Sequence, residues 1–169
     1  MVELTYPHAR FQADVSVAFR SLEPKEGSLF REFDGTTGRF LFNWKPGSRL
    51  EYQLYGRRNL VYTISPRAAY FVDERFGVGV TAPLSWRIRA RAFGEWGDNS
   101  YVMTDPSAEA QVDDVTAYGG SVGIQMGKGM ELVLGLSRTN YDSNFIGSNS
   151  SIFRLTTSIS MGGGGSPWL

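Results

Sequence analysis

The chain has 169 residues, a length that suits one domain, and its charges cancel, with 17 Lys and Arg against 17 Asp and Glu. It contains no Cys, which excludes disulfides, Cys-ligated zinc and thiol nucleophiles, and its single His excludes a His-pair metal site. Zero net charge gives no general attraction to nucleic acid, and no apolar run approaches the roughly 18 residues of a transmembrane helix.

The first eight residues lack the basic region and the apolar stretch of a signal peptide. From there on, apolar and polar residues alternate with a period of two, which predicts strands. In residues 10–21, for example, Phe11, Val15 and Phe19 share one face, and Asp14 lies on the other. The eight predicted strands span residues 10–21, 36–45, 49–58, 69–82, 86–97, 115–126, 130–141 and 152–161.

The connections between these strands alternate in length. Short turns lie near residues 46–48, 83–85 and 127–129, and long loops lie near 22–35, 59–68, 98–114 and 142–151. This alternation predicts an all-β, antiparallel up-and-down sheet with tight turns and both termini at one end and long loops at the other. We expect one domain, residues 1–161, followed by a flexible Gly-rich tail, residues 162–169, that resembles an engineered linker.

Alternation alone fits two architectures. A soluble up-and-down barrel of the lipocalin type would turn its apolar residues inward. A transmembrane β-barrel would turn them outward to lipid and its polar residues into the lumen.

The aromatic residues favour the transmembrane barrel. Trp86 and Trp96 share one face of a predicted strand and lie about 33 Å apart along it, which a tilt of about 40° reduces to about 25 Å of height. Trp44 and Trp86 lie near tight turns, and Tyr70 and Trp96 lie near the long-loop end. These four residues predict two aromatic girdles.

Two further features favour a membrane location. Arg58, Glu74 and Arg138 interrupt the apolar face eight residues from the tight-turn end of their strands, which indicates a common lipid boundary. Outer-membrane barrels also have short periplasmic turns, longer extracellular loops and an even number of strands. We therefore expect an eight-stranded transmembrane β-barrel, closed alone or part of a larger barrel.

Two segments also resemble a known family. Residues 38–52, GRFLFNWKPGSRLEY, and residues 78–88, VGVTAPLSWRI, are similar to hairpins of the porin-like outer-membrane barrels associated with exopolysaccharide gene clusters. The resemblance spans roughly residues 36–161, and because members of that family have more strands, it implies a match to their C-terminal part. It implies the outer membrane of a Gram-negative bacterium, with extracellular long loops, periplasmic termini, and the bilayer and lipopolysaccharide as partners. Further barrel strands or an envelope complex stay open as additional partners.

Under this topology the charges segregate. The inward face would carry a surplus of six positive charges, and the long loops would be acidic by seven. A narrow closed barrel would require solvated rim residues, bound anions or water, or a wider lumen. The alternative is a solvated Arg/Glu ladder that merely fills the barrel. The predicted lumen-lining charged residues are Arg39, Arg49, Glu51, Asp73, Arg75, Arg87, Arg89, Arg91, Glu95, Glu131 and Arg154.

The sequence predicts a structural or porin-like barrel whose basic lumen suits anions or acidic polysaccharide. The alternatives are a non-transporting surface barrel that binds partners through its long loops, and the soluble lipocalin-like carrier. His8 has no legible Ser and acid partners, and we expect no enzymatic activity, cofactor, metal or nucleic-acid partner. The acidic residues Asp105, Glu109, Asp113 and Asp114 are interpreted as a solvated loop rather than a cation site.

Overall fold

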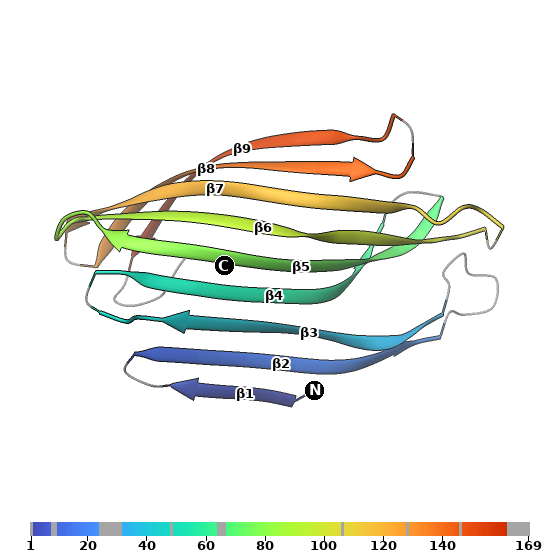
Figure 1. Ribbon diagram of the computed structural model, residues 1–169, viewed down its shortest axis with the longest axis horizontal. Helices are drawn as coiled ribbons and strands as arrows, with labels where there is room; N and C mark the ends of the chain where they lie inside the picture. Colours follow the sequence, from blue (N-terminus) through green and yellow to red (C-terminus); the bar gives the residue numbers. More distant parts are fainter. Residues whose placement is uncertain are drawn as a thin grey trace.

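The computed structural model describes residues 2–7, 10–23, 32–47, 49–63, 67–105, 107–127, 129–145 and 147–161. The strands are β1 (Val2–Pro7), β2 (Phe11–Leu22), β3 (Phe33–Trp44), β4 (Glu51–Tyr62), β5 (Ala68–Pro83), β6 (Ile88–Met103), β7 (Val112–Gly127), β8 (Met130–Ser143) and β9 (Ser150–Met161). They form one antiparallel sheet in which every strand pairs with its neighbours in the sequence (Figure 1). The predicted all-β, up-and-down sheet is confirmed. Within the described ranges, no helix is long and apolar enough to cross a membrane.

The sheet has nine strands rather than the predicted eight, because β1 was not predicted. Val2, Leu4 and Tyr6 do alternate with polar residues, but six residues are too few to stand out as a strand. β1 runs towards the tight-turn end and pairs with only part of β2, with Val2 opposite Val17. The prediction that the chain starts at the tight-turn end is therefore wrong for its first described residues. His8 and the predicted tail lie outside the described residues.

Several strands extend further towards the long loops than predicted. β6 reaches Met103 and β7 starts at Val112, since cross-strand pairing continues where the hydropathy alternation fails. Asp98, Asp114 and Asp142, which were assigned to loops, lie opposite one another in β6, β7 and β8. At the other end, β6 starts only at Ile88, and the expectation that Trp86 and Trp96 share one strand is wrong.

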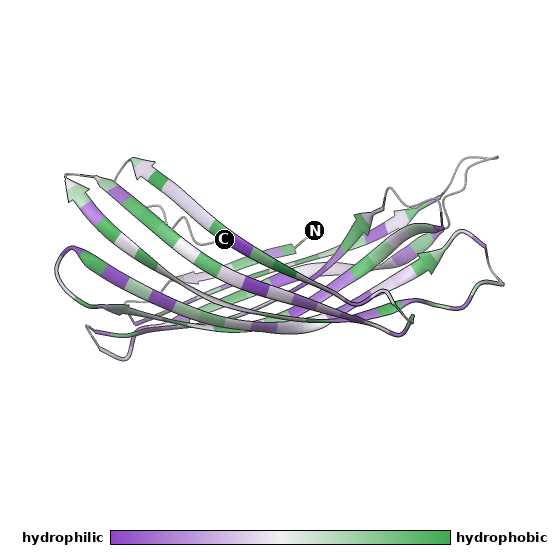
Figure 2. Ribbon diagram, turned by 90° about the horizontal axis from the view of Figure 1, so that it is seen from above, coloured by the Kyte–Doolittle hydropathy of each residue, from purple (hydrophilic) through white to green (hydrophobic). Residues whose placement is uncertain are grey.

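The sheet is curved into an open trough (Figure 2). Its edges are β1 and β9, which do not pair with each other in the described part of the chain. The closed eight-stranded barrel, one of the two expected forms, is thus not what these residues build. Because β2–β9 alternate in direction and β1 is antiparallel to β2, β1 and β9 run in the same direction.

The two faces of the sheet differ in both chemistry and exposure. The face that carries Asp73 and Arg75 is polar, and both residues are only 8% exposed. The opposite face is apolar, yet Val78 and Leu134 are each 43% exposed and Leu155 is 75% exposed. Side chains crowd together on the inside of a curved sheet, so we identify the polar face as the concave face and the apolar face as the convex face.

Aromatic rings packed over glycines fix the register of the central strands. The ring of Phe40 lies over Gly56 on the convex face, and the ring of Tyr55 lies over Gly77 on the concave face. In each case a Cβ on the glycine would lie within 2.4 Å of a ring atom. Such cross-strand contacts resist slippage, which would move every side chain to the other face.

Candidate functional site

The concave face collects most of the charged residues predicted to line a lumen. Following the cross-strand register from Asp73, nine of them share this face: Arg39, Glu51, Asp73, Arg75, Arg89, Arg91, Glu95, Glu131 and Arg154. The other two, Arg49 and Arg87, lie in tight turns outside the strands. Arg87 covers the ring of Trp86, with its guanidinium carbon 4.0 Å from the ring centroid.

Three arginines lie side by side in the middle of the concave face. Arg39 of β3 is opposite Arg57 of β4, and Arg57 is opposite Arg75 of β5. Like charges directly opposite each other destabilise a sheet unless counter-charges separate them. We call these three residues the arginine row.

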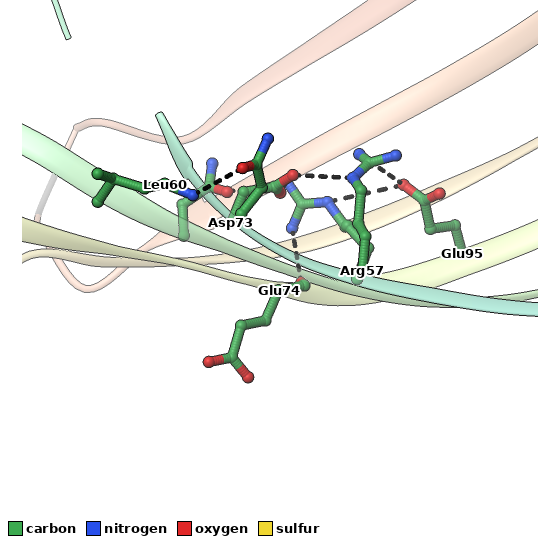
Figure 3. A network of polar contacts seen from close by, with 8 residues as sticks. Arg57, Leu60, Asp73, Glu74 and Glu95 are labelled. Atoms are coloured by element: carbon green, nitrogen blue, oxygen red, sulfur yellow. Dashed lines mark hydrogen bonds and ion pairs between the residues drawn. The ribbon is translucent and has the colours of Figure 1, made fainter. Parts of the chain in front are cut away.

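Asp73 and Glu95 supply the counter-charges (Figure 3). Arg57 Nε donates to Asp73 Oδ2 at 2.9 Å, and Arg57 Nη2 lies 3.8 Å from Glu95 Oε1. Arg75 lies between the same carboxylates, with Nη2 2.9 Å from Asp73 Oδ1 and Nε 3.6 Å from Glu95 Oε1. Figure 3 also shows the side chain of Glu74 pointing away from this network, as expected for a convex-face residue.

Arg75 is the most deeply buried cation of this network, with 6% of its side chain exposed. Its Nη2 donates to Asn99 Oδ1 at 2.9 Å, and its Nη1 contacts the backbone oxygen of Glu74 at 3.4 Å. Asp73 Oδ1 is buried and accepts no hydrogen bond from the described residues, although it lies 2.9 Å from Arg75 Nη2. This contact is therefore an ion pair whose geometry does not meet that of a hydrogen bond. Asp73 Oδ1 can still accept a hydrogen bond inside the network.

A second charge pair lies nearer the tight turns. Arg89 Nη2 donates to both carboxylate oxygens of Glu131, at 2.9 and 3.0 Å. The two residues belong to β6 and β8, so their side chains cross over β7 at Gly123. A Cβ on Gly123 would lie 2.5 Å from Glu131 Oε1, and the glycine leaves the space that the carboxylate occupies.

Polar contacts continue along this face towards the tight-turn end. Arg91 Nη2 donates to Gln53 Oε1, and Gln53 Nε2 donates to Asn43 Oδ1 at 3.0 Å. Lys45 Nζ forms an ion pair with Glu51 Oε2 at 3.0 Å at the turn between β3 and β4. The concave face therefore carries an extended polar network rather than a packed apolar core.

Arg39 and Arg154 differ from Arg57, Arg75 and Arg89, which form ion pairs on the concave face. Neither forms an ion pair with any described residue, and Arg39 is exposed although it neighbours Arg57. Arg39 is therefore the member of the arginine row whose charge is free to meet an anion.

The predicted surplus of positive charge is absent from the strands. The basic residues on their concave face are Arg20, Arg39, Arg57, Arg75, Arg89, Arg91 and Arg154, and the acidic ones are Glu3, Asp14, Glu51, Asp73, Glu95, Asp113 and Glu131. β1 adds Glu3, and the longer β7 adds Asp113. Basic residues are in excess only at the tight-turn end, where the connecting sequences contain Arg10, Lys45, Arg49, Arg87 and Lys128 and no Asp or Glu.

The acidic residues near the long loops do not converge on one point. Asp113 and Asp114 are adjacent in β7 and lie on opposite faces, and the described residues contain no group of three potential metal ligands. Asp105 lies in the loop between β6 and β7, where hydrogen bonds from the backbone N–H and the hydroxyl of Ser107 lower the pKa of its carboxyl.

The convex face carries a continuous band without charge, which we call the apolar band. It comprises Val2, Leu4, Tyr6, Phe11, Ala13, Val15, Val17, Phe19, Gly38, Phe40, Phe42, Trp44, Tyr52, Leu54, Gly56, Phe76, Val78, Val80, Ala82, Ile88, Ala90, Ala92, Gly94, Trp96, Tyr118, Gly120, Val122, Ile124, Met130, Leu132, Leu134, Leu136, Phe153, Leu155, Thr157, Ile159 and Met161. Thr157 is its one aliphatic hydroxyl. All nine strands contribute to this band.

The boundary of the apolar band at the long-loop end crosses the strand register obliquely. The register row through Arg58 contains Val17, Gly38, Glu74, Asp98, Asp114 and Asp142. In β4 the first polar residue, Arg58, lies on this row. In β2 the first polar residue of the convex face is Ser21, which lies four residues beyond Val17. In β8 the first polar residue of this face is Arg138, which lies four residues before Asp142. The boundary thus slips by eight residues over the six steps from β2 to β8.

The four predicted girdle aromatics have different surroundings. Trp44 packs against Tyr52 and Trp96 against Phe76 on the convex face, and Trp44 and Trp96 are 46% and 47% exposed. Trp86 is also exposed but lies in a turn. Tyr70 was predicted wrongly, because it is 4% exposed.

Tyr70 is buried in a small apolar cluster at the long-loop end. It packs edge-on against Phe33, with the ring centroids 5.6 Å apart, and Leu60 and Ala69 complete the cluster. Its hydroxyl donates to the backbone oxygen of Glu32 at 2.8 Å. These contacts join the start of β3 to β5.

Sequence reasoning underestimated two members of the central network. Arg57 is not among the predicted lumen-lining residues, although it bridges Asp73 and Glu95. Asn99 lies in a segment predicted as a loop. The signal that could have found it is its spacing of four residues from Glu95, which places both polar side chains on one face if the strand continues.

Comparisons with known proteins do not identify a family. No family model, no curated protein and no solved structure matches this chain.

Proposed function

We propose that this chain forms part of the wall of a porin-like β-barrel in the outer membrane of a Gram-negative bacterium. The observation that carries the proposal is the apolar band, a charge-free and solvent-exposed surface that runs over all nine strands. A surface of this kind is rare on soluble proteins and is expected where a protein meets lipid.

The oblique boundary of the apolar band supports this proposal quantitatively. A slip of eight residues over six steps is about 1.3 residues per strand. With a rise of about 3.4 Å per residue and a spacing of about 4.8 Å between strands, this slip corresponds to a strand tilt of about 43°. Transmembrane barrels have tilts of about 35–45°. A flat membrane surface cutting tilted strands accounts for the slip.

The height of the apolar band fits the same geometry. It extends ten residues in β2, from Phe11 to Ser21, and eight residues in β8, from Met130 to Arg138. At about 3.4 Å per residue and this tilt, these lengths give about 20–25 Å along the membrane normal, close to the roughly 25 Å of an outer-membrane apolar band.

The exposure pattern argues against a soluble lipocalin-like carrier. Such a barrel needs apolar residues on its inner face. Here Asp73, Arg75 and Glu131 are buried on the concave face, and Leu134 and Leu155 are exposed on the convex face.

The strand directions bear on how the wall is completed. Antiparallel barrels of the bacterial outer membrane have an even number of strands. Because β1 and β9 run in the same direction, closing this sheet by antiparallel pairing needs an odd number of additional strands between them. The open trough and the polar concave face fit a barrel that is wider than eight strands and contains water.

The passage along the concave face would favour anions without catalysing a reaction. The tight-turn end carries the excess of basic residues, and Arg39 in the arginine row has no carboxylate partner within the described residues. Positive side chains that line a wet passage select for anions, including acidic saccharides. With the tight turns in the periplasm, the long loops face the cell exterior and lipopolysaccharide.

Flotation with lipid vesicles, followed by planar-bilayer recording, tests this function. We expect the protein to float with phosphatidylcholine vesicles. We expect the barrel completed by its additional strands to give an anion-selective current, and we expect Arg39→Gln to lower the selectivity. Arg138→Gln, a charge loss on the convex face, is the matched control and should leave selectivity unchanged. Folding in buffer without detergent and no flotation would exclude the membrane location. Flotation without any current from the completed barrel would favour the non-transporting surface barrel.

A further inference from the structure

The convex face has a hollow beside the membrane boundary in β6–β9. Its cavity volume is about 940 Å³, within the range of ligand pockets, and its lining is mainly apolar. Gly120 contributes no side chain to it, while Tyr118, Leu136, Phe153 and Leu155 surround it. Phe153 and Leu155 are 68% and 75% exposed. The hollow is thus open towards the side that the proposed function assigns to lipid.

Arg138 lies at the long-loop end of this hollow. It is opposite Tyr118 of β7 and Phe153 of β9, two aromatic residues at the boundary of the apolar band. Its Nε donates to the neutral oxygens Asn140 Oδ1 and Ser151 Oγ, both at 3.0 Å. These bonds leave the two terminal nitrogens of the guanidinium for another acceptor.

The charge of Arg138 is not balanced by the described residues. The other convex-face cation, Arg58, forms an ion pair with Glu74 directly across the strands. No described carboxylate forms such a pair with Arg138, and the residues in contact with it are neutral. A cation beside an apolar hollow at a membrane boundary complements an anionic headgroup attached to an acyl chain.

We propose that Arg138 and the hollow over Gly120 form a binding site for one phosphate-bearing anionic lipid of the membrane leaflet on the long-loop side. The lipid phosphate accepts charge-assisted hydrogen bonds from the terminal nitrogens of Arg138, with the hydroxyls of Ser151 and Tyr118 nearby. One acyl chain occupies the hollow over Gly120, beside Leu136. This site rests on the proposed membrane location and adds to it a specific lipid class and a specific residue.

Native mass spectrometry of the detergent-solubilised full chain, which measures how much lipid is bound, tests the site. The probe is phosphatidylglycerol, with phosphatidylcholine as the neutral lipid and glycerol phosphate as the free anion. We expect Arg138→Gln to weaken phosphatidylglycerol binding about tenfold, as loss of a charge-assisted hydrogen bond implies, and Arg138→Lys to restore part of it. The matched control is Arg154→Gln, which removes the same charge on the concave face of β9.

The outcomes separate this site from the membrane location itself. Equal binding by the Arg138 and Arg154 variants, or no binding of phosphatidylglycerol by the unaltered protein, would overturn the site. Glycerol phosphate binding as tightly as phosphatidylglycerol would also overturn it, since the hollow would then contribute nothing. Flotation with phosphatidylcholine vesicles is independent of the site, so its failure would instead reject the proposed function.

Discussion

Arg75 shows how a single residue depends on its surroundings on the concave face. It is surrounded by Asp73, Glu95 and Asn99, and almost none of its side chain reaches solvent. A buried ion pair adds little stability compared with a well-packed apolar pair, but removing one partner leaves an uncompensated charge. The network therefore fixes the conformation of the concave face more than it stabilises the fold.

At this scale we predict that Arg75→Met destabilises the protein by about 3–5 kcal/mol, because Asp73 and Glu95 would keep their charge without their buried partner. Lys45→Met is the matched control, since the ion pair of Lys45 with Glu51 is largely exposed and its loss should cost less than about 1 kcal/mol. Urea unfolding in detergent micelles measures both. Equal losses for the two variants would contradict the role given to Arg75.

At the scale of the strands, β6 is held closely against β5 at one point. Gly97 lies opposite Arg75, with a φ of 158°, and a Cβ there would lie 1.9 Å from the backbone oxygen of Glu74. A Cβ on Gly94, three residues earlier in the same strand, would meet no other residue within 4 Å beyond its chain neighbours. The two glycines thus have different structural roles in one strand.

We predict that Gly97→Ala destabilises the sheet by at least about 1–3 kcal/mol, because a methyl group there forces the β5 and β6 backbones apart. Gly94→Ala, the control, should leave stability nearly unchanged or raise it slightly by restricting the unfolded chain. Thermal unfolding followed by circular dichroism compares the two. A Gly97→Ala protein as stable as the control would contradict the close approach of the strands.

The period of two predicted most strands, because the two faces differ so clearly in polarity. It missed β1, which is short, and the ends of β6, β7 and β8, where acidic residues on both faces hide the alternation. Arg89 and Glu131 were both predicted on the inward face, but their pairing across β7 depends on the register and on Gly123. The burial of Tyr70 depends on contact with the start of β3, which no local pattern encodes.

At the scale of the whole molecule, the excess positive and negative charges that cancel in the sequence lie at opposite ends of the strands. Basic residues predominate in the tight turns, and Asp98, Asp114 and Asp142 lie near the long loops. Between them, the apolar band is free of charge on the convex face. The fourteen charges on the concave face of the strands are balanced, and seven of them form ion pairs with described residues. The open edges β1 and β9 are where further strands would complete the proposed barrel.

Accessibility of nitroxide labels along β8 tests the membrane-facing assignment of the apolar band most directly, and the absence of Cys makes every introduced cysteine unique. Single labels at residues 132–138 in vesicle-reconstituted protein would be exposed to oxygen, which enriches in lipid, and to a water-soluble nickel chelate. We predict high oxygen accessibility at positions 132, 134 and 136, lower values at 133, 135 and 137, and loss of the oxygen preference at position 138. Equal access of the nickel chelate to positions 134 and 135, or an oxygen preference at the odd positions, would contradict the membrane-facing assignment.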